Sequence, residues 1–239
     1  MSIEIIILLT VVCMLTYSFE ITFGIAGTII MLTVMTFFVD AKTLVIYSVL
    51  PQILVASIAL LRSPKTVDIK FLAGMVAFAG IGVLIGFYIF YAVDMQTFQL
   101  LLALAITLSG VYLVLRPGRV HLNALTARSL DTTAGVGMAL FGISGPIAMT
   151  RLLASFDDKT VIRNYALSFF LSLNLFRAVG YGINGTVTGD IAEVMLYSAP
   201  FLAVTLWFAN GLHYKVNEQI FRTVVAWIIL LGGISLFFA

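Results

Sequence analysis

Ten apolar segments, separated by short polar stretches, occupy most of this chain of 239 residues. A helix needs about 20 apolar residues to cross the hydrocarbon core of a bilayer, and several segments approach that length. An open sheet cannot satisfy its backbone in lipid, and the alternating pattern of a membrane barrel is absent. The sequence therefore predicts helices over Ile3–Phe19, Thr28–Val39, Thr43–Leu61, Phe71–Tyr91, Phe98–Leu115, Thr126–Leu140, Pro146–Phe156, Val161–Tyr181, Ile191–Ala209 and Ile220–Ala239.

The composition places these helices in a membrane. Hydrophobic residues make up 62% of the chain and charged residues 10%, whereas a soluble domain carries about 25% charged residues. We therefore expect a single membrane domain over residues 1–239, with no soluble domain attached. Cys13 is the only cysteine and no cluster of metal-ligating residues is present, so we expect neither a disulfide nor a metal or other cofactor.

One pentapeptide pattern, Phe-Gly-Ile-x-Gly, occurs at residues 23–27 and again at residues 141–145, 118 residues later. The flanking residues match as well, for example Asp40 with Asp158 and Tyr47 with Tyr165. Internal repeats of this kind are typical of transporters built from two homologous halves. The sequence predicts one repeat over about residues 1–116 and a second over about residues 126–239.

Each copy of the pattern is followed by an apolar segment that is too short to cross a bilayer. Thr28–Val39 and Pro146–Phe156 have about a dozen residues each, and about 20 are needed. In one reading, each short segment merges with its predecessor into a kinked span, which gives eight straight spans. In the other, each pair forms a re-entrant hairpin that turns at the glycines.

The distribution of positive charge favours the hairpins, because Lys and Arg collect in cytoplasmic loops. With the N-terminus outside and both hairpins re-entrant, ten positive residues lie inside and only Lys42 lies outside, while Arg151 and Arg177 fall within the membrane. The reading with eight straight spans puts six positive residues inside and five outside. The predicted halves are therefore inverted repeats, each with a broken or re-entrant helix and three spanning helices. The ten inside residues are Arg62, Lys65, Lys70, Arg116, Arg119, Arg128, Lys159, Arg163, Lys215 and Arg222.

The predicted tips carry the chemistry of an anion site. A helix that starts within the membrane leaves its first N–H groups unpaired, and the positive end of its dipole favours an anion. Glycines allow a sharp turn and a close approach of a ligand to the backbone. Ser144 and Thr28 can cap a helix or bind the ligand. These arguments select the tip residues Gly24, Ala26, Gly27, Thr28, Gly142, Ser144 and Gly145.

Two polar residues in the span Val161–Tyr181 extend this candidate site. An ionisable residue within a membrane span indicates function, and Arg177 can clamp an oxyanion through two hydrogen bonds. The alternative for Arg177 is a structural ion pair or an extension of its side chain toward the membrane interface. Asn174 is three residues away and so shares its helix face. The matching span of the first half carries Gln52 and Ser57 instead, so the polar chemistry of the halves differs.

Other charged residues receive different interpretations. Glu20 lies three residues before Phe23, within reach of the first tip, where it could carry a coupling proton or pair with Arg177. The alternative interpretation is that Glu20 simply lies at the membrane interface. Arg151 is expected to extend toward the inside interface. Asp40 and Asp158 each follow a short helix, and we expect them to act in loops and caps, with no role in transport.

These motifs resemble those of the sulfite exporter TauE/SafE family of bacterial membrane permeases. The resemblance covers essentially the whole chain and rests on the duplicated Phe-Gly-Ile-x-Gly, the polar span after its second copy and the Gly-rich penultimate span. Family members usually carry a run of glycines at these tips. Here the runs are interrupted, as Gly24-Ile25-Ala26-Gly27 and Gly142-Ile143-Ser144-Gly145, which bears on the substrate more than on the fold.

The resemblance implies a secondary transporter in the bacterial inner membrane that moves sulfite, thiosulfate or an organosulfonate. The alternative is a passive anion channel or facilitator that uses the same site. We expect no enzyme, because the sequence has no nucleophile elbow and no paired carboxylates at a plausible site. The expected partners are a small anionic substrate and the lipid bilayer, with no nucleic acid; a homo-oligomer is left open.

Overall fold

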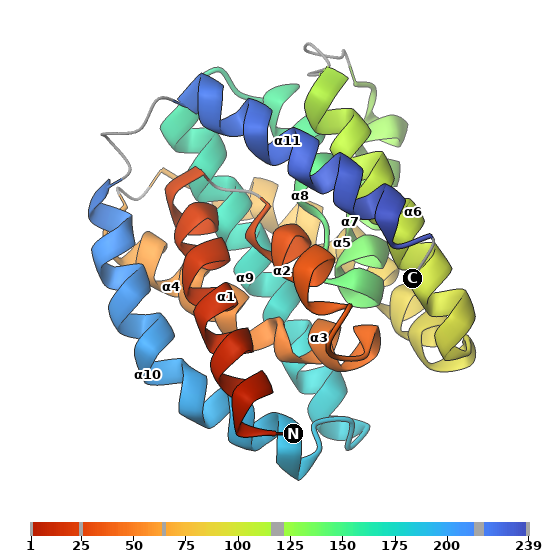
Figure 1. Cartoon of the computed structure of the whole chain (residues 1–239). Coiled ribbons are helices and arrows are strands. Elements are labelled where there is room, and N and C mark those ends of the chain that lie inside the picture. Colours follow the sequence, from red (N-terminus) through yellow and green to blue (C-terminus); the bar gives the residue numbers. More distant parts are fainter. Residues whose placement is uncertain (1, 24–25, 64–65, 116–121, 213–217, 238–239) are drawn as a thin grey trace.

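The computed structural model describes residues 2–23, 26–63, 66–115, 122–212 and 218–237 (Figure 1). Within these ranges the chain forms eleven helices and no strand, which confirms the predicted all-α class. They are α1 (Ile3–Phe23), α2 (Gly27–Met35), α3 (Ala41–Tyr47), α4 (Val49–Leu61), α5 (Ile69–Ala92), α6 (Met95–Leu115), α7 (Ala124–Phe141), α8 (Gly145–Leu153), α9 (Lys159–Ile183), α10 (Gly189–Leu212) and α11 (Glu218–Ser235).

Six segments in the described part of the chain are long and apolar enough to cross a membrane. They are α1, the combined α3 and α4, α5, α6, α9 and α10. The protein is therefore a multi-pass membrane protein. The ends of the predicted segments lie within four residues of the ends of the helices, and one segment, Thr43–Leu61, is divided at Ser48 into α3 and α4.

Pro51 accounts for the division between α3 and α4. A proline ring inside a helix clashes with the carbonyl of the fourth residue before it, which here is Tyr47, the last residue of α3. Ser48 occupies the break, and its hydroxyl donates to the Val45 carbonyl oxygen at 2.7 Å. The break matters for the candidate site, because it opens the last turn of α3 to contacts from another helix.

The short helices α2 and α8 have nine residues each and begin at equivalent places in the two pentapeptides. Each folds back along the helix before it. Gly27 packs so closely on α1 that a Cβ atom there would lie 2.6 Å from the Thr16 carbonyl oxygen. In the second hairpin, Arg151 of α8 pairs with Asp131 of α7 at 3.5 Å. Both pairs of helices are thus hairpins within the fold.

The aspartates that match between the repeats are helix caps. Asp40 accepts a hydrogen bond from Thr43 N at 2.8 Å and begins α3. Asp158 accepts from Thr160 N at 2.7 Å and from Val161 N at 3.0 Å, and begins α9. Each satisfies backbone donors that a helix start leaves free, as the sequence led us to expect.

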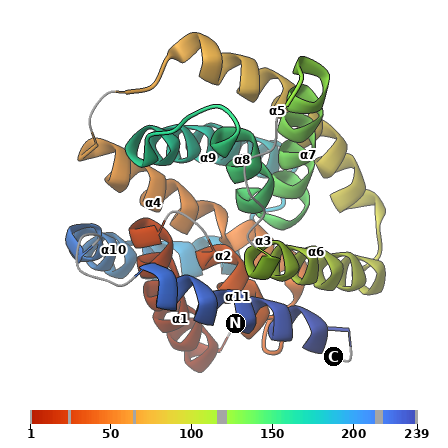
Figure 2. The ribbon, with the colours of Figure 1, turned by 90° about the horizontal axis from the view of Figure 1, so that it is seen from above.

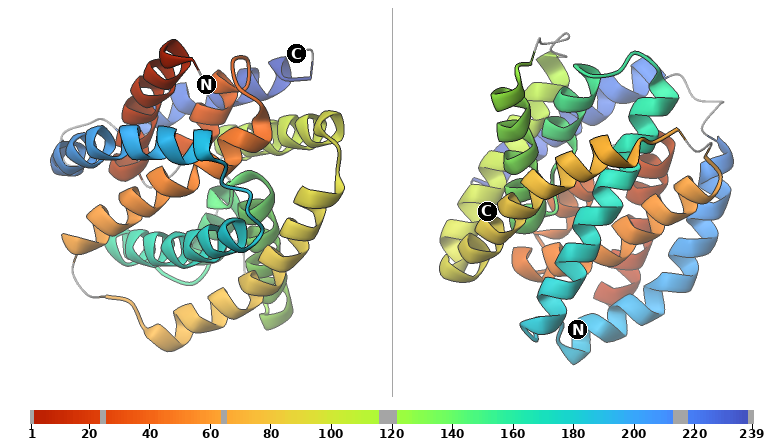
Figure 3. Two further views of the ribbon diagram at one scale, coloured as in Figure 1. Left: turned by 90° about the horizontal axis from the view of Figure 1, so that it is seen from below. Right: turned by 180° about the vertical axis from the view of Figure 1, so that it is seen from behind.

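The helices pack in pairs that join the two halves of the chain. α1 lies beside α10, and α6 lies beside α11 (Figures 1 and 2). α9 lies between α4 and α5 (Figure 3), and α5 also packs along α7. The α5–α7 contact is close because of glycines: a Cβ atom at Gly82 would lie 1.9 Å from the Thr132 carbonyl oxygen.

The end of α4 and the beginning of α9 meet on one face of the molecule. Arg163 donates to the Ser63 hydroxyl at 3.4 Å, and Asn164 donates to the Thr66 hydroxyl at 2.9 Å. Arg163 also donates to the Ile21 carbonyl oxygen and to the Asn210 side chain, each at 3.1 Å. The last turns of α1, α4 and α10 therefore gather around the first turn of α9.

Candidate functional site

A small cavity lies where the two hairpin tips meet. Its volume is about 30 Å³, which is room for one or two water molecules. Both halves of the chain contribute to its wall. The lining residues are Glu20, Ala26, Thr28, Ile29 and Gln52 from the first half and Met138, Gly142, Ile143, Ser144, Gly145 and Phe170 from the second.

Behind this cavity lies Arg177, whose side chain has no exposed surface. Its guanidinium donates to the Val45 carbonyl oxygen at 2.7 Å, where α3 breaks, and to the Ser48 hydroxyl at 3.1 Å. It also donates to Asn174 Oδ1 at 2.8 Å, the contact expected from their spacing. Arg177 Nε has no hydrogen-bond partner among the described residues. A buried positive charge with a free donor is an attractive place for an anion.

Gln52 connects Arg177 to both tips. Its Oε1 accepts a hydrogen bond from Arg177 at 3.3 Å. Its amide nitrogen donates to the Gly142 carbonyl oxygen at 2.8 Å and to the Thr28 hydroxyl. One buried side chain therefore joins the arginine of α9 to the turn of each hairpin.

At the first tip, a carboxylate already occupies the start of α2. Glu20 Oε2 accepts from Thr28 N at 2.9 Å and lies 3.3 Å from the Thr28 hydroxyl. Glu20 thus takes the place that a bound anion would have at the beginning of the helix. Ala26 has a φ of 84°, a left-handed conformation that is strained for any residue with a Cβ atom.

At the second tip, the start of α8 has no such cap. Gly142 supplies the left-handed turn, with a φ of 70°. Ser144 lines the cavity and is 2% exposed, and its buried hydroxyl has no hydrogen-bond partner in the described part of the chain. A buried polar group without a partner costs about 1–3 kcal/mol, so a ligand that bonds to this hydroxyl recovers that free energy. Pro146 follows within the first turn, where its missing N–H is harmless.

The structure brings most of the predicted site residues together. Ala26, Thr28, Gly142, Ser144 and Gly145 line the cavity, and Gly27 begins α2 beside the Glu20 carboxylate. Asn174 and Arg177 do not line the cavity, but Arg177 donates hydrogen bonds both to Asn174 and to Gln52, which does. Gly24 lies outside the described residues, as do the predicted loop residues Lys65, Arg116, Arg119 and Lys215.

Sequence reasoning did not place Gln52 in the site, although it is a buried amide in an apolar span, 5% exposed. It also missed the partner of Arg151. That side chain pairs with Asp131, which is 3% exposed, and stacks over the Phe71 ring at 4.9 Å. Arg151 therefore binds within the protein, in contrast to the expected extension toward the interface.

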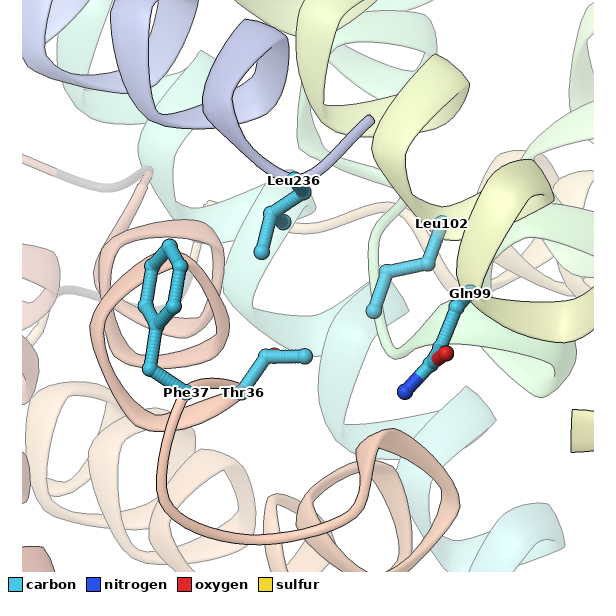
Figure 4. Close-up of a pocket in the computed structure, with 5 residues that line it drawn as sticks. All are labelled: Thr36, Phe37, Gln99, Leu102 and Leu236. Carbon is cyan, nitrogen blue, oxygen red and sulfur yellow. The ribbon is translucent and has the colours of Figure 1, made fainter. Parts of the chain in front are cut away.

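Two other hollows are less suited to an anion. One, of about 160 Å³, lies between the end of α2, α6 and the end of α11, and Figure 4 shows its five lining side chains, none of which is charged. The other, of about 600 Å³, lies between α5 and α9 and is lined mainly by apolar and aromatic side chains. The cavity at the tips is the one of the three that has a buried guanidinium behind it.

Comparison with known protein families gives one match. The profile described as "Sulfite exporter TauE/SafE" matches residues 9–236. The match therefore includes both hairpins, the cavity between them and Arg177. No significant similarity to a curated protein or to a solved structure was found.

Proposed function

This chain belongs to the sulfite exporter TauE/SafE family of membrane transporters, and we propose that it is a secondary transporter of a small sulfur-containing anion. The proposed substrates are sulfite, thiosulfate or an organosulfonate, and the proposed location is the bacterial inner membrane. The anion would bind between the two hairpin tips and pass as the halves of the protein rock around it.

One observation carries the choice of site. Ser144 lines a cavity between two helix starts, its buried hydroxyl has no hydrogen-bond partner among the described residues, and the buried Arg177 guanidinium lies behind the cavity. Helix starts, hydroxyl groups and guanidinium groups all stabilise oxyanions. Burial strengthens these interactions, since the effective dielectric constant in a protein interior is far below that of water.

We further propose that the halves are inverted repeats with re-entrant hairpins. The offset of 118 residues makes α1 equivalent to α7, α4 to α9, α5 to α10 and α6 to α11. When each helix is replaced by its equivalent, the α5–α7 contact becomes α10–α1 and the α5–α9 contact becomes α10–α4. Both members of each pair of contacts are present in the structure. The contacts of α6 with α11 and of α4 with α9 map onto themselves. Such a pattern supports a two-fold relation between residues 1–116 and 126–239.

The hydrogen bonds between α4 and α9 support the same topology. The straight reading puts the end of α4 and the start of α9 on opposite sides of the membrane. In the structure, Ser63 and Thr66 contact Arg163 and Asn164 directly. A single cysteine at Lys159, in a Cys13→Ala background, should resist a membrane-impermeant maleimide added to whole cells. A cysteine at Asp94 should react. Equal labelling of the two positions would contradict the inverted arrangement.

Transport can be tested with purified protein in proteoliposomes and labelled thiosulfate or sulfite. We expect uptake by the wild type and at least about a hundredfold loss in Arg177→Ala, because removal of a buried charged partner costs about 3–5 kcal/mol. Arg128→Ala is the matched control, since Arg128 is exposed at the start of α7. Equal rates for the two variants would remove Arg177 from the site.

The same vesicles distinguish a carrier from a passive facilitator. An imposed proton gradient drives uphill accumulation only if the protein couples the two movements. Accumulation of the anion inside the vesicles above its outside concentration would exclude the passive alternative. Equal concentrations on the two sides would favour it.

A further inference from the structure

Glu20 places a negative charge in the same cavity that the proposed substrate would occupy. Glu20 lines the cavity together with Ser144 and Gly145. Its carboxylate accepts the N–H of Thr28, in the first turn of α2, at 2.9 Å. The packing leaves little room to move, since a Cβ atom on Gly27 would lie 2.6 Å from Glu20 Oε2. An anion that enters the cavity therefore meets a carboxylate held in place.

Within the part of the chain that the structure describes, no positive group pairs directly with this carboxylate. Among the described residues Glu20 has no ion pair. On its own helix the nearby titratable group is Tyr17, whose hydroxyl lies 3.2 Å from that of Thr28. α2 and α4 carry no ionisable side chain. α10 contacts this part of α1 through Ala209, far along the helix from its acids Asp190 and Glu193.

Arg163 and Arg177 of α9 form their hydrogen bonds with groups other than the Glu20 carboxylate. Arg163 reaches the backbone of Ile21 and the Asn210 side chain. Arg177 reaches Glu20 only through a chain of hydrogen bonds, in which Arg177 donates to Gln52, Gln52 donates to Thr28, and the Thr28 hydroxyl faces Glu20 Oε2. The two charges stand at opposite ends of this chain, and the proposed anion would be attracted by one and repelled by the other.

Two negative charges in one small cavity repel each other, and protonation of the Glu20 carboxylate relieves the repulsion. We propose that the anion binds together with one proton, which Glu20 carries. The proton comes from water on the side of entry and forms an O–H bond on the Glu20 carboxyl group. The neutral carboxyl then becomes a donor toward the anion, and both are released on the other side.

This inference rests on the proposed function, and it deepens it by naming the coupling ion. The test uses the full chain in detergent and thiosulfate as the probe, because thiosulfate, in contrast to sulfite, keeps its charge between about pH 6 and 8. Isothermal titration calorimetry in buffers of different ionisation enthalpy gives the number of protons taken up on binding. For the wild type we expect uptake that approaches one proton, and an affinity that falls by up to about tenfold per pH unit as Glu20 ionises.

Variants at two acids of α1 separate Glu20 from general effects. Glu20→Gln should bind thiosulfate with an affinity constant to within about twofold across this pH range and without proton uptake. Glu20→Asp retains a titrating group and should keep the proton uptake. Glu4→Gln is the matched control, because Glu4 is exposed near the other end of α1. It should behave as the wild type does.

The outcomes distinguish the inference from the function beneath it. Thiosulfate binding by the wild type without proton uptake, or with a requirement for sodium in its place, would overturn the role of Glu20 and leave the anion site standing. Absence of binding by thiosulfate, sulfite and an organosulfonate at every pH would overturn the proposed function and this inference together.

Discussion

The two hairpin tips have nearly the same sequence, but a carboxylate caps the helix start at the first tip and no side chain caps it at the second. At the first tip, the start of α2 is capped by the Glu20 carboxylate, and the Thr28 hydroxyl is engaged by Gln52. At the second tip, the start of α8 has no side-chain cap and Ser144 has no partner among the described residues. The first tip is satisfied by the protein itself, whereas the described residues leave the Ser144 hydroxyl of the second tip without a partner.

The difference shows that a repeated motif fixes where a helix begins without fixing the chemistry around it. Both copies lead into a nine-residue helix that folds back, although the left-handed residue is the fourth of the first pentapeptide, Ala26, and the second of the other, Gly142. The chemistry comes from residues outside the pentapeptide, chiefly Glu20, Gln52 and Arg177, whose equivalents 118 residues away are Met138, Phe170 and Ala59. None of these equivalents has a charge or a polar group that could form the same contacts.

Breaking the link between the tips should have the largest effect. In Gln52→Leu, Arg177 loses one acceptor, and the Gly142 carbonyl oxygen and the Thr28 hydroxyl lose their donor. We expect a loss of about 2–4 kcal/mol in unfolding free energy, because buried polar groups are left without partners. Thermal and chemical denaturation in detergent would measure it. Gln99→Leu, at an exposed position, should stay within about 0.5 kcal/mol of the wild type. Similar stabilities would mean that the tips are independent.

The left-handed residues should respond in opposite directions. A Cβ atom at Gly142 would lie 2.9 Å from Ser48 Oγ and 3.2 Å from the Arg177 guanidinium, at a φ of 70°. Gly142→Ala should therefore cost about 2 kcal/mol. Ala26→Gly relieves strain at the other tip and should change stability by less than about 1 kcal/mol, in the stabilising direction. Melting temperatures of the two variants provide the comparison, and a loss at both positions would contradict it.

The two hydroxyl groups should separate stability from binding. Thr28→Val removes a hydroxyl that contacts Glu20, Tyr17 and Gln52, so we expect a loss of about 1–2 kcal/mol in stability. Ser144→Ala removes a hydroxyl without a partner, so stability should hold or rise slightly. Its thiosulfate affinity should fall about tenfold, or about 1.4 kcal/mol. A large loss of stability in Ser144→Ala would show that this hydroxyl has a structural partner.

The caps should show where the halves still behave alike. Asp40→Ala and Asp158→Ala each remove a side chain that accepts from backbone N–H groups at a helix start. Each should cost about 0.5–1 kcal/mol, with little effect on anion binding. Denaturation curves of both variants, next to a thiosulfate titration, would reveal any unexpected role in transport.

The sequence predicted the helices and much of the site because both depend on local patterns. Apolar length and charge placed the segments, and the three-residue spacing of Asn174 and Arg177 predicted their contact. Ser144 and Thr28 were selected from their position at a helix start, and both line the cavity.

The contacts that sequence reasoning missed join residues far apart in the chain. Gln52 meets Gly142 across 90 positions, and Arg151 meets Asp131 only because α8 folds back on α7. The role of Glu20 at the start of α2 likewise depends on the turn of the first hairpin. Local spacing cannot reveal such pairings, since they are set by how the helices pack.

The size of the cavity has a consequence for affinity. At about 30 Å³ it leaves little spare room around a small ligand, so the proposed anion fits only when the tips stand at a suitable distance from each other. When a binding-competent arrangement is only one of several, the measured dissociation constant rises in inverse proportion to its population. An anion held this way is bound less tightly than its contacts alone would give. Moderate affinity suits a carrier, because a tightly bound substrate would be released only slowly on the far side.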